Sequence, residues 1–134
     1  MPSLSNVFDP NVGPLLRVAM APPGWQDGGQ LVVFDALVDT GASTTCIAPA
    51  VATALGLPIL GMRSMASATH SAVAVPLYIC DLIIPFSGTT HYIARGLQVL
   101  EFAPPATFQA LLGRDVICRG ALAMSSDCHM TFSI

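Results

Sequence analysis

Two apolar segments, far apart in the sequence, each run directly into a tight turn that carries a glycine. Residues 36–38 (Ala-Leu-Val) lead into Asp39-Thr40-Gly41, and residues 110–112 (Ala-Leu-Leu) lead into Gly113-Arg114-Asp115. Glycine lets the backbone turn sharply at the end of a buried strand. The repeat therefore predicts two similar strand–turn units and an approximate two-fold symmetry within the chain.

Short apolar runs bounded by proline and glycine fill most of the remaining sequence, and they predict more strands than helices. Strands are expected at residues 15–21, 31–38, 44–48, 62–68, 72–84, 91–102, 108–112 and 129–134. Short helices are expected at 49–56, where Pro49 suits a first helical position and Gly56 a stop, and at 114–122. No linker interrupts the pattern, so one domain is expected over residues 1–134, with residues 1–14 loosely ordered.

The composition excludes several classes of protein. With 53% hydrophobic and 10% charged residues, the 134-residue chain is too apolar to be disordered and has little polar material to cover an isolated small domain. Part of its apolar surface is therefore expected to be buried against a partner. The net charge is −3 and the five arginines are spread along the chain, so nucleic acid is not expected as a partner.

Membrane, secretion and metal signals are also missing from the sequence. No stretch reaches the roughly eighteen consecutive apolar residues of a membrane helix, and the N-terminal residues lack the basic and apolar regions of a secretory signal. No membrane partner is expected, and the expected location is cytoplasmic. The four cysteines, at positions 46, 80, 118 and 128, have no paired ligand spacing, so buried free thiols, no metal and no other cofactor are expected.

Asp39 stands directly after a buried apolar strand. A carboxylate in that place must be paired, hydrogen-bonded or protonated, because burying an unpaired charge is costly. Thr40 and Ser43 offer hydroxyls that can tie the loop to its surroundings. The tripeptide alone leaves two interpretations open: a reactive carboxylate, or a structural turn in which Asp39 hydrogen-bonds its own backbone.

Taken together, the two motifs resemble those of the retroviral-type, single-domain aspartic proteases, the retropepsins. The resemblance rests on Leu37-Val38 before Asp39-Thr40-Gly41, on Ala42-Ser43 after it, and on the later Leu111-Leu112-Gly113-Arg114-Asp115; it extends from about residue 15 to the C-terminus. It implies a mostly β fold, a closed retropepsin-like acid-protease barrel with a flap hairpin and one or two short helices. It also implies a symmetric dimer whose active site receives one Asp from each subunit.

The chemistry of peptide hydrolysis agrees with a dimer. Without a metal, the reaction needs a base that takes a proton from water and an acid that gives one to the leaving nitrogen, and two carboxyls sharing one proton supply both. We therefore expect a homodimeric aspartic endopeptidase that cuts extended peptide or protein segments with apolar side chains near the scissile bond. The alternative is a catalytically silent dimeric module for peptide binding or assembly.

The resemblance assigns roles to individual positions. Asp39, Thr40 and Gly41 form the catalytic motif, with Thr40 interlocking with its twin across the dimer axis. Gly113, Arg114 and Asp115 form the second motif, and for Arg114 and Asp115 capping and scaffold roles are the alternative to a direct part in catalysis. The residues expected to bind substrate are Ala42, Ser43, Thr69, His70, Phe108, Gln109 and Leu111. For Phe108 and Leu111 a place in the core is an equal alternative, and His70 could be an ordinary loop histidine.

Two departures from the family pattern bear on function. The position of Ser43 is acidic in many retroviral members and pairs there with the arginine of the second motif, so Arg114 lacks this partner. The expected flap, residues 62–75, has no glycine at its tip, residues 68–71. His91 and His129 lie in expected strands without an identified carboxylate or serine partner, so a Ser-His-Asp triad is not supported. Residues 129–134 are expected to form a strand of the dimer interface.

Overall fold

The computed structural model describes residues 2–67, 70–86 and 90–134 of the chain, and of residues 66–67 and 70–72 the backbone alone. The helices are α1 (Pro49–Leu55) and α2 (Arg114–Ile117). The strands are β1 (Ser3–Val7), β2 (Leu15–Ala21), β3 (Val32–Val38), β4 (Cys46–Ile47), β5 (Gly61–Ser67), β6 (His70–Pro85), β7 (His91–Glu101), β8 (Ala110–Leu112), β9 (Ala121–Met124) and β10 (His129–Ser133).

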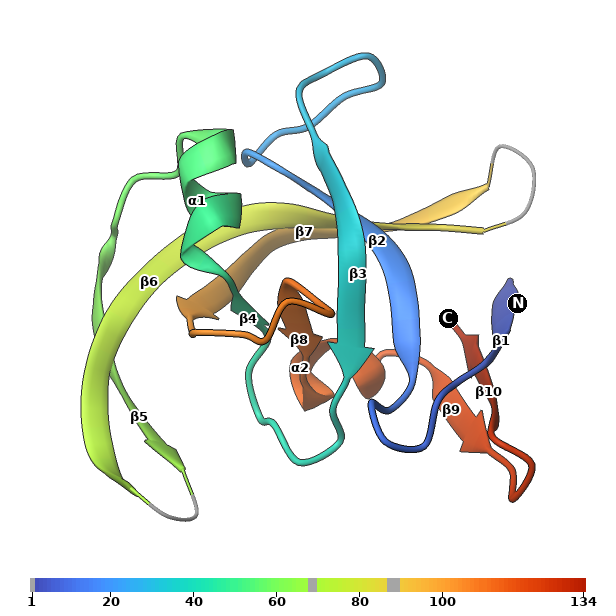
Figure 1. Ribbon diagram of the computed structural model, residues 1–134. Coiled ribbons are helices and arrows are strands. Elements are labelled where there is room, and N and C mark those ends of the chain that lie inside the picture. Colours follow the sequence, from blue (N-terminus) through green and yellow to red (C-terminus); the bar gives the residue numbers. More distant parts are fainter. Residues whose placement is uncertain (1, 68–69, 87–89) are drawn as a thin grey trace.

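The larger sheet closes on itself. Its strand order is β2-β3-β8-β4-β7-β6-β5, and an additional pairing of β2 with β6 turns the first six of these strands into a closed barrel. β5 extends β6 as a hairpin at one end of the molecule, while the two chain termini lie side by side at the other end (Figure 1). The expected mostly β fold and closed barrel are confirmed.

Alternating apolar residues direct one face of the barrel strands into the core. In β2, Leu16, Val18 and Met20 are at most 1% exposed, whereas Arg17 between them is exposed. α1 adds its buried side chains to the same core. As expected, the helix begins at Pro49 and stops at Gly56, which takes the left-handed conformation (φ +63°).

The expected helix over residues 114–122 is wrong beyond Ile117. The chain turns at Gly120, where an added Cβ would lie 2.0 Å from the backbone oxygen of Ser133. Only a glycine permits this close approach, and it brings β9 alongside β10 as an antiparallel partner. Residues 121–124 are therefore a strand, because pairing across the chain overrides their local helical pattern.

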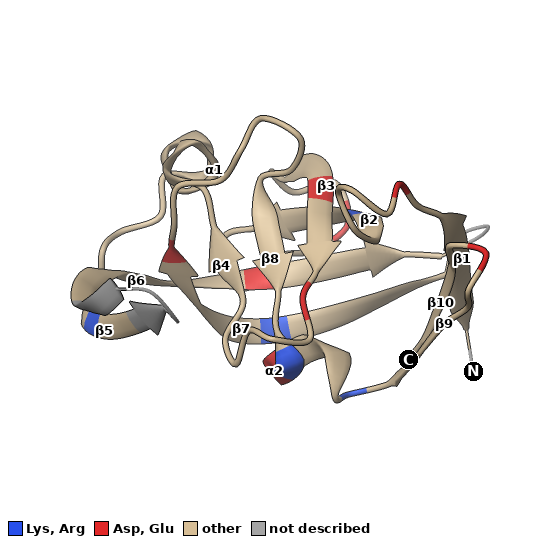
Figure 2. Cartoon of the chain, turned by 60° about the horizontal axis from the view of Figure 1, so that its bottom comes forward, with Lys and Arg blue, Asp and Glu red and all other residues tan. Residues whose placement is uncertain are grey.

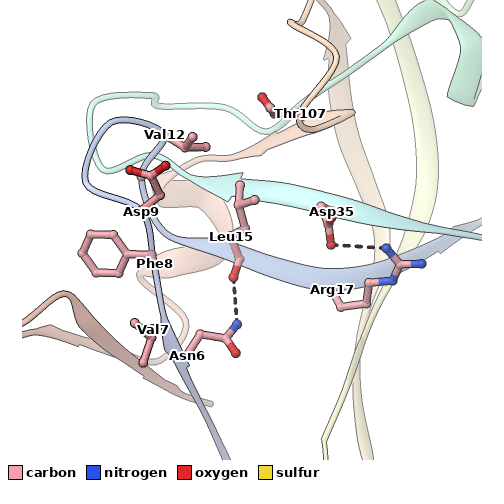
Figure 3. Close-up of a pocket in the computed structure, with 10 residues that line it drawn as sticks. Asn6, Val7, Phe8, Asp9, Val12, Leu15, Arg17, Asp35 and Thr107 are labelled. Atoms are coloured by element: carbon pink, nitrogen blue, oxygen red, sulfur yellow. Dashed lines mark hydrogen bonds and ion pairs between the residues drawn. The ribbon is translucent and has the colours of Figure 1, made fainter.

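The N-terminal segment also differs from expectation. Ser3–Val7 forms β1, which pairs antiparallel with β10, in place of a loosely ordered segment. Asn6 Nδ2 donates to the backbone oxygen of Leu15 at 2.9 Å and so ties this segment to β2 (Figure 3). β10 is consequently the central strand of a three-stranded sheet β1-β10-β9, and both of its edges are paired within the chain.

Smaller differences concern strand lengths and thiols. The expected strands at 44–48 and 108–112 shorten to β4 and β8. Cys46 and Cys80 are buried free thiols as expected, but Cys118 is exposed and Cys128 half-buried. The flap hairpin forms from β5 and β6, with residues 68–69 of its tip outside the described residues. Neither helix in the described part of the chain is long and apolar enough to cross a membrane.

A buried carboxylate anchors the loop between β2 and β3. Asp81 on β6 is 1% exposed, and its Oδ2 accepts hydrogen bonds from the backbone N–H groups of Gly24 (3.0 Å) and Trp25 (2.9 Å). Its Oδ1 accepts from Gly96 N–H (2.9 Å), and Arg95 Nη1 lies 2.9 Å from Oδ2. Burial by itself raises the pKa of Asp81, but these hydrogen bonds outweigh it and hold the pKa below its ordinary value.

We predict that Asp81→Asn lowers the free energy of unfolding at pH 7 by about 3 kcal/mol, because it removes a buried charge that three N–H groups and Arg95 require. A carboxyl whose pKa is lowered by folding stabilises the protein above its unfolded pKa of about 3.9, and this contribution is lost as the pH falls through the folded pKa. The difference between wild type and variant should therefore shrink below about pH 4.

Urea unfolding at pH steps from 7 to 3 measures this difference. Asp35→Asn is the matched control: Asp35 pairs with Arg17 at 3.3 Å on the surface, where such pairs contribute less than about 1 kcal/mol. Equal losses in the two variants would contradict the anchoring role of Asp81.

Candidate active site

The two strand–turn units lie next to each other. β3 and β8 pair in parallel, with Leu37 opposite Leu111 and Val38 opposite Leu112. Beyond the last pair, the N–H of Asp39 donates to the backbone oxygen of Leu112 at 3.0 Å. The sequence repeat is thus a structural repeat, and both turns begin at the same end of the barrel.

Asp39 sits on a tight loop and is partly exposed. Its Oδ1 accepts the N–H of Gly41 at 2.9 Å, and its backbone oxygen accepts the N–H of Ala42 at 3.2 Å. This self-contained turn is the local structure that the structural interpretation predicted. It does not exclude a reactive role, because partial exposure keeps the carboxylate within reach of solvent.

The second turn packs directly against the first. A Cβ added at Gly113 would lie 2.8 Å from the backbone carbon of Thr44 and 3.0 Å from the backbone oxygen of Ala42. Real side chains do not fit at these distances, so glycine is required by packing. The next residue, Arg114, donates its N–H to the same oxygen of Ala42 at 2.8 Å.

Thr45 and Asp115 form a clamp that the sequence analysis did not identify. Thr45 is fully buried, and Asp115 Oδ2 and Oδ1 accept its N–H at 2.9 Å and its hydroxyl at 2.8 Å. The hydroxyl oxygen of Thr45 in turn accepts the N–H of Gly113 at 3.2 Å. The only signal in the sequence is the pair of threonines, Thr44 and Thr45, at the start of the expected strand 44–48. Nothing local in the sequence relates Thr45 to Asp115, which the expected helix over 114–122 places in a first helical turn.

Arg114 has a backbone partner in place of the acidic residue that the family pattern supplies. Its Nη1 donates to the backbone oxygen of Thr40 at 2.8 Å. Ser43, at the position that is often acidic, is exposed and faces a cavity. The second motif therefore supports the loop that carries Asp39 through Arg114 and Asp115, which agrees with the scaffold interpretation of both residues.

A cavity of about 370 Å³ opens beside the loop of residues 39–44, which carries Asp39. It lies between this loop, residues 63–65 of β5, and the barrel strands β4, β7 and β8. Its lining residues are Gly41, Ala42, Ser43, Thr44, Cys46, Arg63, Ser64, Met65, Leu100 and Leu111. The structure thus brings three of the expected substrate-binding residues, Ala42, Ser43 and Leu111, to one cavity.

The other expected binding residues lie elsewhere. Phe108 is buried at 8% exposure and stacks on Phe102 with ring centroids 6.5 Å apart. Gln109 donates its side-chain amide to the backbone oxygen of Ala106 at 3.4 Å and does not line the cavity. Thr69 lies outside the described residues, as does the side chain of His70, whose backbone begins β6.

The thiol of Cys46 forms part of the cavity wall and is expected to be unreactive. Burial, followed by the negative charges of Asp115 and Asp39, raises its pKa to about 11. A thiol with such a pKa stays protonated at neutral pH and is a poor nucleophile. Its Sγ lies 4.0 Å from Met65 Sδ, so the two sulfur atoms form an apolar surface inside the cavity.

His129 has a carboxylate partner, which corrects the sequence analysis. Its Nδ1 lies 3.1 Å from Asp127 Oδ2, and the hydroxyl of Ser125 donates to Oδ1 of the same carboxylate. The serine bonds to the carboxylate and not to the imidazole, so the order of a catalytic triad is not formed. All three residues lie at the turn between β9 and β10.

A second cavity, of about 460 Å³, lies between the N-terminal segment and β2–β3 (Figure 3). Arg17 and Asp35 form an ion pair of 3.3 Å along it. It contains none of the residues expected to act on substrate. Over residues 2–67, 70–86 and 90–134, no group of three or more His, Cys, Asp or Glu residues is arranged to hold a metal ion.

Comparison with known proteins decides the family. Residues 29–119, more than half of the chain, match the family described as gag-polyprotein putative aspartyl protease. The chain belongs to this aspartyl protease family. The matched span contains both motifs and every strand of the barrel except β2.

The fold is similar to a solved member of the retropepsin-like group. A crystal structure of a retropepsin-like aspartic protease from Rickettsia conorii superposes with a TM-score of 0.67 and 13% sequence identity, covering 97% of this chain and 89% of that one. At this identity the likeness shows the fold alone. No curated protein matches the chain.

We predict that Asp115→Ala lowers the free energy of unfolding by about 2 kcal/mol, because it leaves the buried N–H and hydroxyl of Thr45 without acceptors. A double-mutant cycle with Thr45→Val should show a coupling of about 1 kcal/mol between the two side chains. Urea unfolding measures both. Asp127→Ala, on an exposed turn, is the control, and additive losses for the Thr45 and Asp115 variants would rule out the clamp.

We predict that alanine substitutions of Leu111 and Phe108 have different effects on stability and on peptide preference. Phe108→Ala removes a buried ring and is expected to cost about 3–5 kcal/mol of stability with little change in peptide preference. Leu111→Ala truncates a half-buried cavity wall, so it should change which peptides are cut at a smaller loss of stability. Thermal unfolding and cleavage profiles on a mixed peptide pool test both; the reverse pattern would place Leu111 in the core.

Proposed function

We propose that this chain is an aspartic endopeptidase that works as a homodimer, with water activated between two Asp39 carboxyls, one from each subunit. The observation that carries the proposal is the place of Asp39. It is partly exposed, on a loop tied by backbone hydrogen bonds to Leu112 and Arg114, next to residues that line a cavity of about 370 Å³.

The proposed reaction needs two carboxyls in different protonation states. The ionised Asp39 takes a proton from water as the water oxygen attacks the peptide carbon, and the protonated Asp39 of the other subunit polarises the carbonyl oxygen. Transfer of a proton to the nitrogen lets the C–N bond break. The products leave with the site again holding one proton between the two carboxyls.

A second copy is required because one chain does not supply the second carboxyl. Asp115 belongs to the neighbouring turn, but both of its oxygens accept hydrogen bonds from Thr45. It is therefore held as a scaffold and cannot share a proton with Asp39. In the three-stranded terminal sheet, β10 is paired on both sides, so a partner would add at β1 or β9, and β10 itself would contribute from the centre of the sheet.

The proposed substrate is an extended peptide with apolar side chains near the scissile bond. Loop residues 41–44 lie along the cavity and offer backbone groups to an extended chain, which can bind as an added strand. Met65, Leu100 and Leu111 give the cavity its apolar wall. Together these features favour recognition of the peptide backbone and of the apolar part of one substrate side chain.

The alternative remains a silent dimeric module that binds peptides without cutting them. The observation that favours it is the flap tip at residues 68–71, which has no glycine and therefore fewer backbone conformations for closing over a substrate. This alternative predicts peptide binding with no products, whereas the protease predicts both.

Subunit mixing tests the proposed site directly. Asp39→Asn keeps the shape of the side chain and removes its titratable oxygen, so the variant should fold and lack activity. After exchange with an equal amount of this variant, about half of the wild-type subunits remain in wild-type dimers, and activity per wild-type subunit should fall to about half. Cleavage of a peptide pool, followed by mass spectrometry, measures the activity.

Asp35→Asn serves as the mixing control, because Asp35 lies on β3 in a surface ion pair away from the catalytic loop. Mixing with it should leave the activity per wild-type subunit unchanged. Activity of Asp39→Asn at the wild-type rate would refute the role of Asp39. An inactive Asp39→Asn that does not reduce wild-type activity, even in large excess, would refute the shared site.

A further inference from the structure

We propose that Arg63 selects substrates that place an acidic side chain, glutamate above all, in the cavity beside the catalytic loop. This inference rests on the proposed protease function and adds a chemical preference to it. Arg63 is the one charged residue among the described residues that line this cavity. The cavity therefore combines an apolar interior with a single positive charge.

The position of Arg63 follows from the flap hairpin. It lies in β5, opposite Val75 of β6, and in register two residues before Met65, so the two side chains share one face of the hairpin. Met65 reaches the buried thiol of Cys46 inside the cavity. Arg63, which is exposed, stands on the same face nearer the solvent and so marks the mouth of the cavity.

The guanidinium is oriented by a neutral partner. Its Nη2 donates to Gln98 Oε1 at 3.2 Å across the sheet, and among the described residues it forms no ion pair. A guanidinium has five N–H donors in a planar fork, so most of its donors are open to a carboxylate. In Figure 2 the basic position of β5 lies at one end of the molecule, away from the basic position of α2.

The chemistry of the walls specifies the side chain that fits. Met65, Leu100 and Leu111 can cover the methylene groups of a glutamate, and its carboxylate can reach the guanidinium at the mouth. Without Arg63, such a side chain would meet the negative charge of Asp39, which is close enough to act on the Cys46 thiol. The arginine offsets this repulsion, and it forms an ion pair with a glutamate, whereas the uncharged amide of a glutamine only accepts a hydrogen bond from the guanidinium.

The test uses matched peptides that differ by one residue. The parent is a peptide that the wild type cuts or, if it cuts none, one that Asp39→Asn binds, and each position of the parent is made in turn Glu or Gln. At one position the wild type should cut the Glu peptide with kcat/KM about five- to tenfold above the Gln peptide, the range of a partly screened charge-assisted contact. Arg63→Gln should bring this ratio close to one, and Arg63→Glu should favour Lys at that position.

Arg17→Gln is the control, since Arg17 is an exposed arginine of β2 that pairs with Asp35 outside the cavity. It should keep the wild-type ratio. Equal rates for Glu and Gln at every position, or a ratio that Arg63→Gln leaves unchanged, would overturn the role of Arg63 while the protease function stands.

A binding arm separates the inference from the proposed function. Fluorescence anisotropy with Asp39→Asn and the labelled peptides should show tighter binding of the Glu peptide, lost in the double variant with Arg63→Gln. If the wild type cuts no peptide but this preference is present, the protease function fails and the Arg63 site stands. If the Glu and Gln peptides bind equally or not at all, the Arg63 site fails.

Discussion

The parallel pairing of β3 with β8 is the contact on which the candidate site depends. It sets the turns that follow both strands side by side, and backbone hydrogen bonds then join them, from Asp39 to Leu112 and from Arg114 to Ala42. The Thr45–Asp115 clamp closes the loop at its far end. A carboxylate held in this way has little freedom to lose on binding a substrate, and such preorganisation is what catalysis by positioning requires.

Three carboxylates of this chain differ in how many hydrogen bonds they accept, and this number distinguishes carboxylates that hold the fold together from one that is free to react. Asp81 accepts hydrogen bonds from three backbone N–H groups and from Arg95, and it is buried. Asp115 uses both oxygens on Thr45. Asp39 accepts one backbone N–H and stays partly exposed. The first two are committed to the fold, whereas Asp39 keeps acceptor capacity that water or a second carboxyl can use.

The sequence was sufficient for the features that local patterns encode. Short apolar runs bounded by proline and glycine predicted the barrel strands, and the repeated strand–turn pattern predicted two similar units. That these units lie side by side appears only in the parallel pairing of β3 with β8. Contacts between distant segments were not encoded locally: the pairing of residues 121–124 with β10 depends on the close approach of Gly120 to Ser133. The Thr45–Asp115 clamp was missed for the same reason, because a buried threonine and a helix-start aspartate show their relation only after β4 and β8 have paired.

The exchange of an acidic residue for Ser43 links the scaffold of the site to its charge. With no carboxylate at this position, the side chain of Arg114 donates to the backbone oxygen of Thr40 and so stabilises the loop that carries Asp39. No acidic residue of the described part of the chain then lines the cavity, where Arg63 is the charged lining residue, and the negative charges that act on its Cys46 thiol come from Asp115 and Asp39 behind the wall. The same substitution that weakens the family's ion pairing thus leaves Arg63 without a competing carboxylate on the cavity wall, so its charge is available to the substrate.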